Sequence, residues 1–294
     1  MASSTVTWKR LVRYINKAGN IQYGEPILDS TNQDISLLAA NGHLQVCVCE
    51  GSNALEAKPT TKIETVEQLL GPLTPEEVPI IRCIGLNYKT HILETGRPLP
   101  TCPTIFTKPS LSIADHDVPI PIPSIAQQKA DYEGELVILI SKAGKNIPVE
   151  LALDHVAAYT VGNDVSARDW QRDADKAGPV PQWTFSKSFD KYAPLGPCLV
   201  SSAVLGEANK QELRTTVNGE QRQKGNTADL CFGVRSLVSF CSQGQTLQAG
   251  SIIMTGTPGG VGLFMKPPCF LKNGDVVEVD IEGIGRLKNV IIFE

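Results

Sequence analysis

The chain has 294 residues, of which 41% are hydrophobic and 20% charged, and its mean hydropathy is −0.07. These values are typical of a globular protein and exclude a disordered or fibrous chain. The formal net charge of −4, without a long basic run, argues against a protein that binds nucleic acid. No apolar stretch approaches the length that spans a bilayer, so no membrane partner is expected.

The N-terminal residues predict a cytoplasmic protein. The first 24 residues contain basic side chains and no acid, a feature shared with mitochondrial transit peptides. Residues 8–14, however, alternate between apolar and mostly basic side chains, as an opening strand would. We therefore favour the cytoplasm over the mitochondrion. The eight cysteines of a large chain without a secretory signal are expected to be reduced thiols.

In chain order, residues 1–75 are expected to form a small β-rich N-terminal domain. Within it, residues 62–70 carry apolar side chains at helical spacing, and the following Gly71 and Pro72 would end that helix. A second, larger domain is predicted over residues 76–294.

The second domain is expected to consist mostly of strands. Seven prolines in residues 97–123 exclude a helix and disfavour a central strand, so this segment is predicted to be a long ordered loop. Short helices fit residues 149–156 and 229–242. The fold class is therefore mixed α/β and β-rich, with short helices at the margins of the core. Strands are predicted at residues 78–84, 135–140, 157–163, 250–255, 275–281 and 288–293.

Two glutamates open the most apolar predicted strand. Glu133 and Glu135 flank a glycine just before the run Leu136-Val-Ile-Leu-Ile140, so alternation places both carboxylates on one face. Asp164 follows the next predicted strand and a turn-forming Gly-Asn pair. Three carboxylates suit a hard divalent cation, which prefers oxygen ligands. The alternative is a solvated strand face whose acids pair with lysines.

A histidine and a glutamate form a candidate acid–base pair. His91 and Glu94 are three residues apart, so they share a face of a helical turn. A carboxylate beside an imidazole orients the ring and raises its basicity, as a general base requires. An ordinary surface pair with the same spacing is the alternative.

Two further segments are candidates for binding an anionic substrate. Lys187 lies among aromatic residues, where it would neutralise a substrate carboxylate or a developing enolate; a lysine extending from an edge strand is the alternative. Gly256 and Thr257 open a glycine-dense segment after an apolar strand, whose backbone N–H groups would form a nest for a carboxylate. A plain tight turn would look the same in sequence.

Six motifs resemble, in order, those of the fumarylacetoacetate hydrolase family, over about residues 79–294. Each motif alone is modest, but six in the family's order are specific for the family, though not for a substrate. The motifs are Gly85-Leu-Asn-Tyr with His91 and Glu94; Asp131-Tyr-Glu-Gly-Glu135; Gly162-Asn-Asp-Val-Ser-Ala-Arg-Asp169 with Gln171; Thr184-Phe-Ser-Lys-Ser-Phe189; Val217-Asn-Gly-Glu220; and Thr255-Gly-Thr-Pro-Gly-Gly-Val-Gly262.

The resemblance implies a mixed β-roll core, the small N-terminal β-rich domain and a homodimer. It implies Mg²⁺ or Mn²⁺ held by Glu133, Glu135 and Asp164. His91 and Glu94 match the family's catalytic dyad, carried on a lid that orders over the substrate.

The resemblance also bears on substrate recognition. Lys187, Gln171 and Thr257 match positions that contact a bound oxo acid, whereas Arg168 would either touch the substrate or support its loop. The sequence is more similar to the oxaloacetate decarboxylase and acylpyruvate hydrolase branch than to fumarylacetoacetase. The tyrosine- and acid-rich sequence that fumarylacetoacetase carries before its catalytic histidine is not evident here.

The activity that the resemblance implies is divalent-metal-dependent cleavage of a C–C bond in a small 2-oxo or 1,3-dicarbonyl acid, through a metal-bound enolate. Decarboxylation of oxaloacetate and hydrolysis of an acylpyruvate both fit, because both release the enolate of pyruvate. The alternatives are an isomerase, tautomerase or hydratase of a specialised oxo acid, or a non-catalytic, metal-stabilised scaffold. A scaffold would have no need of the His91 and Glu94 pair.

Overall fold

Strands make up most of the regular structure. The computed structural model describes residues 6–30, 33–94 and 96–294, without the side chain of Glu94. The predicted class, a mixed α/β fold rich in strands with short peripheral helices, is confirmed. Within the described ranges, no helix is long and apolar enough to cross a membrane.

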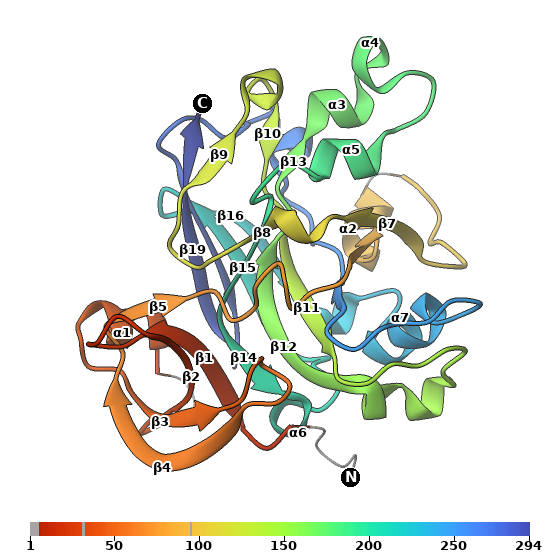
Figure 1. Ribbon diagram of the computed structural model, residues 1–294. Coiled ribbons are helices and arrows are strands. Elements are labelled where there is room, and N and C mark those ends of the chain that lie inside the picture. Colours follow the sequence, from red (N-terminus) through yellow and green to blue (C-terminus); the bar gives the residue numbers. More distant parts are fainter. Residues whose placement is uncertain (1–5, 31–32, 95) are drawn as a thin grey trace.

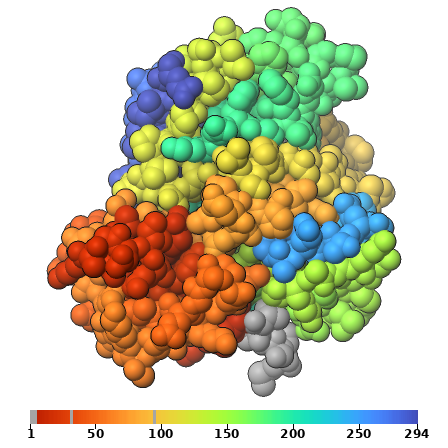
Figure 2. Space-filling model, in the orientation of Figure 1, coloured from red at the N-terminus to blue at the C-terminus, as the bar shows by residue number. Residues whose placement is uncertain are grey.

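The N-terminal strands are drawn in red and orange at the lower left of Figure 1, and Figure 2 shows the same residues gathered at one end of the molecule. Strand β1 pairs with β2 and β5, and its residues Arg10 and Leu11 also pair with β14 (Ala193–Ser201). The N-terminal strands thus continue the main sheet, and the boundary between residues 1–75 and 76–294 stays a prediction. The elements of this part are β1 (Arg10–Ile15), β2 (Ile21–Pro26), α1 (Ile35–Ala40), β3 (Gln45–Glu50), β4 (Lys58–Thr65) and β5 (Gln68–Leu70).

The main sheet has twelve strands in the described residues. Its central strands β11 and β12 are buried along their whole length. Strand β8 (Ile113–Ala114) pairs with β14 outside the main path. From β14 onward the order is β12 (Val156–Asn163), β11 (Gly134–Ile140), β17 (Ile252–Met254), β6 (Ile81–Gly85) and β7 (Thr104–Lys108).

A five-stranded sheet packs against one face of β11 and β12. Alternation along β11 shows the two layers, since Leu136 and Ile138 share a core cluster with Val279 of the second sheet, whereas Val137 packs in a cluster with Trp8. Burial of both faces explains why β11 is apolar throughout. The second sheet has the order β16 (Glu220–Asn226), β15 (Glu212–Val217), β18 (Val276–Ile281), β19 (Gly285–Phe293) and β9 (Ile120–Ile122).

Short helices lie at the margins of these sheets. A helical segment of α3, α4 and α5 follows the two-stranded ladder of β10 and β13 and appears in green at the upper right of Figure 1. The ladder and the α-helices are β10 (Ala130–Asp131), β13 (Ser166–Ala167), α2 (Lys89–Glu94), α3 (Arg168–Arg172), α4 (Ala174–Ala177), α5 (Trp183–Lys187), α6 (Ser202–Leu205) and α7 (Val234–Cys241). The 3-10 helices are η1 (Ser110–Ser112), η2 (Ser124–Ala126), η3 (Val149–His155), η4 (Thr227–Asp229) and η5 (Gly262–Phe264).

The helix predicted over residues 62–70 is wrong. These residues end β4 and form β5, and the amide of Glu67 between them donates to the carbonyl of Ile15. Ile63, expected on the buried face of a helix, is 57% exposed. Residues 60–66 are mostly β-branched and favour an extended chain, so pairing with neighbouring strands overrides the apparent helical spacing.

The loop predicted over residues 97–123 contains the short strands β7, β8 and β9 and, although its prolines were expected to exclude a helix, the single-turn 3-10 helix η1 after Pro109. Pro103 and Pro109 lie just outside β7. Pro121 lies inside β9, which pairs only with β19 in the described structure, and an edge strand tolerates a missing N–H donor.

The other predicted elements are confirmed with shifted ends. All six predicted strands are present as β6, β11, β12, β17, β18 and β19. The helix predicted over residues 149–156 is the 3-10 helix η3, and the one predicted over residues 229–242 shortens to α7.

Candidate active site and metal centre

Strand pairing brings the three predicted metal ligands together. Strands β11 and β12 are antiparallel with Gly134 opposite Asn163, so the start of β11 lies beside the end of β12. The amide of Asp164 donates to the carbonyl of Glu133 (2.8 Å), and the Asn163 side chain accepts from the amide of Glu133 (2.9 Å). Carboxylate oxygens of Glu133, Glu135 and Asp164 all lie within 4.8 Å of one another.

The glycine between the two glutamates is required by the second sheet. A Cβ atom on Gly134 would lie 2.3 Å from the hydroxyl of Thr215 and 2.8 Å from a methyl group of Val279. The backbone therefore rests directly on β15 and β18. Glu133 and Glu135 point away from that contact, on the opposite face of the strand.

Two lysines neutralise part of this acidic cluster. The Lys187 ammonium lies 2.8 Å from Glu133 and 2.5 Å from Asp164. Lys108, the last residue of β7, lies 2.5 Å from the other oxygen of Asp164 and also donates to the carbonyl of Tyr192. Lys108 is not among the residues singled out from the sequence, and no local pattern marks it, because its partner Asp164 lies 56 residues later in the chain.

Glu135 has no ion pair in the described structure; instead its carboxylate accepts from the amide of Gly256 at 2.7 Å. Burial and the nearby charges of Asp164 and Glu133 raise the pKa of Glu135 well above its ordinary value. With the neighbouring Asp131 included, four carboxylates face three cationic groups, those of Lys108, Lys187 and Arg168. The carboxylates of Glu135 and Asp164 are buried. An all-oxygen, electron-rich donor set with an excess negative charge fits Mg²⁺ or Mn²⁺.

Arg168 connects this acidic cluster to Gln171, which is a predicted substrate-binding residue. Its guanidinium lies 2.8 Å from Asp131 and 2.6 Å from Glu133, and it donates to the side-chain oxygen of Gln171 at 3.0 Å. Burial opposes its charge, but Glu133 and Asp131 outweigh burial and raise the pKa of Arg168. Burial likewise opposes ionisation of Glu133, yet Lys187 and Arg168 lower the pKa of Glu133 to about 2.

The glycine-dense segment after β17 binds carboxylates of the protein itself. The amide of Gly256, held at φ +95°, donates to Glu135, and the amides of Gly262 and Leu263 donate to Asp131 at 2.8 and 3.0 Å. The Thr257 hydroxyl donates to the carbonyl of Gly134. The predicted nest exists, but Gly256 supports a metal-ligand candidate and does not line the cavity.

A cavity of about 790 Å³ lies beside these groups. Six of the residues singled out from the sequence line it, namely His91, Glu133, Arg168, Gln171, Lys187 and Thr257. Apolar walls come from Phe106, Trp183, Val261, Leu263, Phe264 and Met265. A concave site with a few convergent charged groups and apolar walls is typical of a small-molecule binding site.

His91 reaches the cavity from helix α2. Its side chain is buried, and its ring centroid lies 5.6 Å from that of Phe264 in η5. The helix places Glu94 one turn after His91, as the spacing predicts. The Glu94 side chain lies outside the described residues, so its pairing with His91 stays a prediction.

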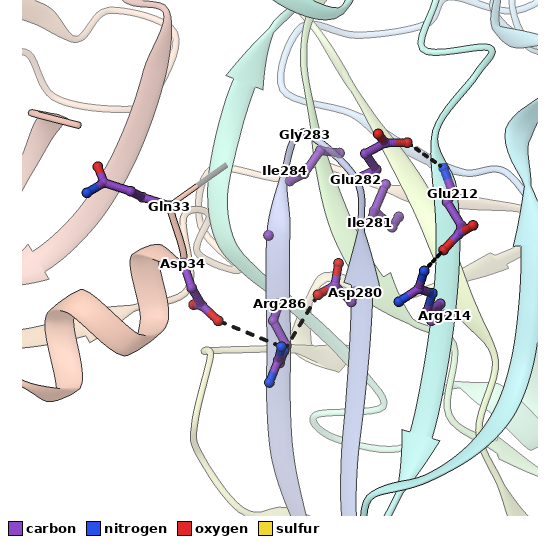
Figure 3. A pocket seen from close by; sticks show the side chains of 11 residues that line it. Gln33, Asp34, Glu212, Arg214, Asp280, Ile281, Glu282, Gly283, Ile284 and Arg286 are labelled. Carbon is purple, nitrogen blue, oxygen red and sulfur yellow. Dashed lines mark hydrogen bonds and ion pairs between the residues drawn. The ribbon is translucent and has the colours of Figure 1, made fainter. Parts of the chain in front are cut away.

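A second depression lies between the N-terminal part and the five-stranded sheet (Figure 3). Its charged groups pair with one another, Arg286 with Asp34 and Asp280, and Arg214 with Glu212. The residues singled out from the sequence do not line it, so it is not the candidate active site.

The sequence is similar to a known protein family and to characterised enzymes. The sequence model of the family described as fumarylacetoacetate (FAA) hydrolase, C-terminal, matches residues 80–292. The chain is 45% identical over 224 residues to the mitochondrial oxaloacetate tautomerase of Xenopus laevis, covering 76% of this chain and 68% of that protein. It is 39% identical over 305 residues to the caffeoylpyruvate hydrolase of Neonothopanus nambi, covering 99% and 96%.

Solved structures agree with this comparison. The crystal structure of 2-hydroxyhepta-2,4-diene-1,7-dioate isomerase from Mycobacterium marinum matches with a TM-score of 0.77 and 30% identity, covering 97% of this chain and 99% of that one. The family match spans well over half of the chain and confirms the predicted resemblance, including its oxaloacetate and acylpyruvate branch. The chain is therefore an enzyme of the fumarylacetoacetate hydrolase family.

Proposed function

We propose that this enzyme holds a divalent cation and hydrolyses a C–C bond in a small 2-oxo or 1,3-dicarbonyl acid of the acylpyruvate type. The observation that carries the proposal is the cavity of about 790 Å³ in which His91, Lys187 and Glu133 meet, with Glu135 and Asp164 adjacent. The similarity to a caffeoylpyruvate hydrolase along almost the whole chain supports this choice of reaction.

The charged groups of the site would stabilise an oxyanion. Mg²⁺ or Mn²⁺, held by Glu133, Glu135 and Asp164, would act as a Lewis acid toward a substrate oxygen. Burial opposes the charge of Lys187, but Asp164 and Glu133 raise the pKa of Lys187 to about 12, so its ammonium stays protonated at neutral pH. A fixed positive charge lining the cavity stabilises negative charge that develops on the ketone oxygen.

Binding of the acid group would fall to Arg168 and Gln171, which line the cavity and hydrogen-bond each other. A guanidinium and a side-chain amide held in one orientation suit a planar carboxylate. The ion pairs of Arg168 with Asp131 and Glu133 fix that orientation, so Arg168 would serve both roles that the sequence left open. Thr257, whose hydroxyl bonds to Gly134, would shape the opposite wall.

His91, assisted by Glu94, would move protons. In hydrolysis it takes a proton from water, the resulting hydroxide attacks the distal carbonyl, and the C–C bond breaks to give a carboxylic acid and the enolate of pyruvate. A proton delivered to the enolate carbon then completes pyruvate. A lid that carries His91 would limit access of bulk water.

Tautomerisation of oxaloacetate is the second candidate, because the chain is 45% identical to an oxaloacetate tautomerase. The same His91 would carry a proton between carbon and oxygen without breaking a C–C bond. Decarboxylation of oxaloacetate uses the same charge stabilisation and would appear in the same assay.

We further propose that the enzyme is a homodimer in the cytoplasm. Light scattering would check the oligomeric state, and cell fractionation the compartment.

The test incubates the purified protein with acetylpyruvate or oxaloacetate, with Mg²⁺, Mn²⁺ or EDTA. Pyruvate is followed with a coupled dehydrogenase, and the keto–enol ratio by absorbance. Metal-dependent pyruvate from acetylpyruvate supports the hydrolase, and accelerated keto–enol exchange without pyruvate supports the tautomerase. If neither occurs, the proposed reactions are wrong and the non-catalytic scaffold becomes the better explanation.

A histidine substitution tests the proton-transfer role. We expect His91→Ala to lose turnover but to keep binding Mn²⁺, because the metal candidates lie on other elements. The matched control is His43→Ala, at an exposed position outside the cavity. Retained activity in His91→Ala would show that another group moves the proton.

A further inference from the structure

The outer part of the cavity is lined by cations that the proposed reaction does not use. Arg97, Arg172 and Lys266 contribute from three separate segments, namely the residues after α2, the end of α3 and the segment after η5. All three side chains are exposed. In the described part of the chain, none of them forms an ion pair with a carboxylate.

These arginines lie close enough to repel one another. Partial burial, then Arg97 and Arg168, lower the pKa of Arg172, and among the described side chains no acid opposes this shift. Converging guanidinium groups without a carboxylate between them are electrostatically unfavourable until an anion joins them. Inside the cavity, by contrast, Arg168 and Lys187 are already matched by Asp131, Glu133 and Asp164.

An apolar side chain lies between His91 and Arg172. The Phe264 ring lies 5.6 Å from the His91 ring and 5.5 Å from the central carbon of the Arg172 guanidinium. Arg172 is therefore one aromatic side chain away from the proposed proton-transfer residue. Phe106, Trp183 and Val261 continue the apolar wall, and the cavity of about 790 Å³ has room for a longer substrate than oxaloacetate.

We propose that Arg97 and Arg172 form a second anion subsite, which selects 2-oxo acids that carry a second carboxylate at the far end of a short apolar chain. The first carboxylate binds inside the cavity at Arg168 and Gln171, the apolar chain lies along Phe264, and the second carboxylate lies between Arg97 and Arg172. The inference rests on the proposed function for the position of the first carboxylate, and Arg97 and Arg172 are its specificity-determining residues.

The affinities of two 2-oxo acids, measured without turnover, test the proposed subsite. In calorimetry with the Mg²⁺-loaded protein, 2-oxoadipate should bind roughly tenfold more tightly than 2-oxohexanoate, which has a methyl group in place of the second carboxylate. The preference should shrink as salt is added, because the arginines are exposed. The double variant Arg97→Gln with Arg172→Gln should bind the two acids equally, whereas Arg172→Lys alone should retain part of the preference.

A matched control separates charge at the subsite from overall charge. Arg214→Gln removes an exposed arginine that lines the depression of Figure 3 and should leave the preference unchanged. Equal affinity of the native protein for the two acids, or a preference that survives the double variant, would overturn the proposal.

Kinetics link the subsite to the reaction. For an acylpyruvate with a terminal carboxylate and for its terminal methyl ester, the double variant should raise KM roughly tenfold for the carboxylate only and leave kcat within about twofold. Equal loss on both substrates would contradict the assignment. Charge-selective binding without cleavage of either acylpyruvate would uphold the subsite and reject the proposed hydrolysis, so the two failures are distinguishable.

Discussion

Among the three carboxylates of the proposed metal centre, Glu135 is the one whose negative charge has no positively charged side chain beside it in the described structure. Lys187 and Lys108 contact Asp164, and Lys187 and Arg168 contact Glu133, while Glu135 receives one backbone N–H. Removing a buried carboxylate from water is unfavourable unless a positive charge replaces the lost hydration. The positive charge of a divalent cation would stabilise the folded state at this point.

We therefore predict that Mg²⁺ raises the unfolding temperature of the native protein and has little effect on Glu135→Gln. In EDTA, the variant should be at least as stable as the native protein, because an amide is not repelled by Glu133 and Asp164. Differential scanning fluorimetry with and without Mg²⁺ measures both effects, with the exposed Glu76→Gln as control. An equal Mg²⁺ shift in native protein and variant would exclude Glu135 as a ligand.

His116 is a buried histidine that does not line the proposed active site. We expect it to make the free energy of unfolding depend on pH. Burial lowers the pKa of His116 below its ordinary value of 6.5, against the opposing effect of Asp117, Asp34 and Asp115. The unfolded chain therefore binds this proton first as the pH falls, so stability is lost below about 6.5 and the full contribution is present above it.

The corresponding prediction concerns His116→Asn, which keeps an acceptor for the backbone N–H of Lys288. Between pH 7 and pH 5, the free energy of unfolding of the native protein should fall more steeply than that of the variant, by at most about 1.4 kcal/mol per pH unit. Urea unfolding at several pH values measures the two slopes. Parallel slopes would show that His116 is not responsible.

At the scale of elements, the register of β11 against β12 brings together the carboxylates of the proposed metal centre. Pairing Gly134 with Asn163 places Asp164 next to Glu133, and alternation places Glu135 on the same side. The opposite face of Gly134 rests on β15 and β18. The position of the carboxylates thus depends on how the two sheets pack.

We predict that Gly134→Ala destabilises the protein by about 1–3 kcal/mol and weakens Mn²⁺ binding, because the added methyl group would overlap Thr215 and Val279. Chemical denaturation and metal titration measure the two effects. The added variant Thr215→Ala, which removes the closest contact, should restore part of both. A Gly134→Ala protein with native stability would mean that the two sheets separate easily.

At the scale of the whole molecule, the N-terminal strands and the remaining chain share one sheet and one core cluster. Trp8 and Leu11 pack in the same cluster as Ile81 and Leu139. Arg13 forms an ion pair with Asp115 as well. Such contacts couple the stability of the two parts.

The protein should therefore unfold in a single cooperative transition. In calorimetry, the measured enthalpy should equal the van't Hoff enthalpy, although the sequence divides the chain at residues 75 and 76. Two separate transitions, one of them lost when the N-terminal strands are destabilised by Leu11→Ala, would show two independent domains.

The sequence determined those features that depend on local pattern. Six strands follow from apolar runs of strand length, and Glu133, Glu135 and Asp164 were found because carboxylates beside such runs are unusual. The helix over residues 62–70 was wrong because a short segment can carry helical spacing by chance while its partners, Leu44 and Ile15, lie elsewhere in the chain.

Only the tertiary structure decided which charges meet. Lys108 lies 56 residues before Asp164 and is missed by any local pattern, yet it contacts Asp164 because β7 and the end of β12 lie at the same edge of the site. The amides of Gly256 and Gly262 were predicted to bind an anion, and the fold supplies that anion from Glu135 and Asp131. Residue chemistry is local, whereas electrostatic partners depend on distances that folding alone sets.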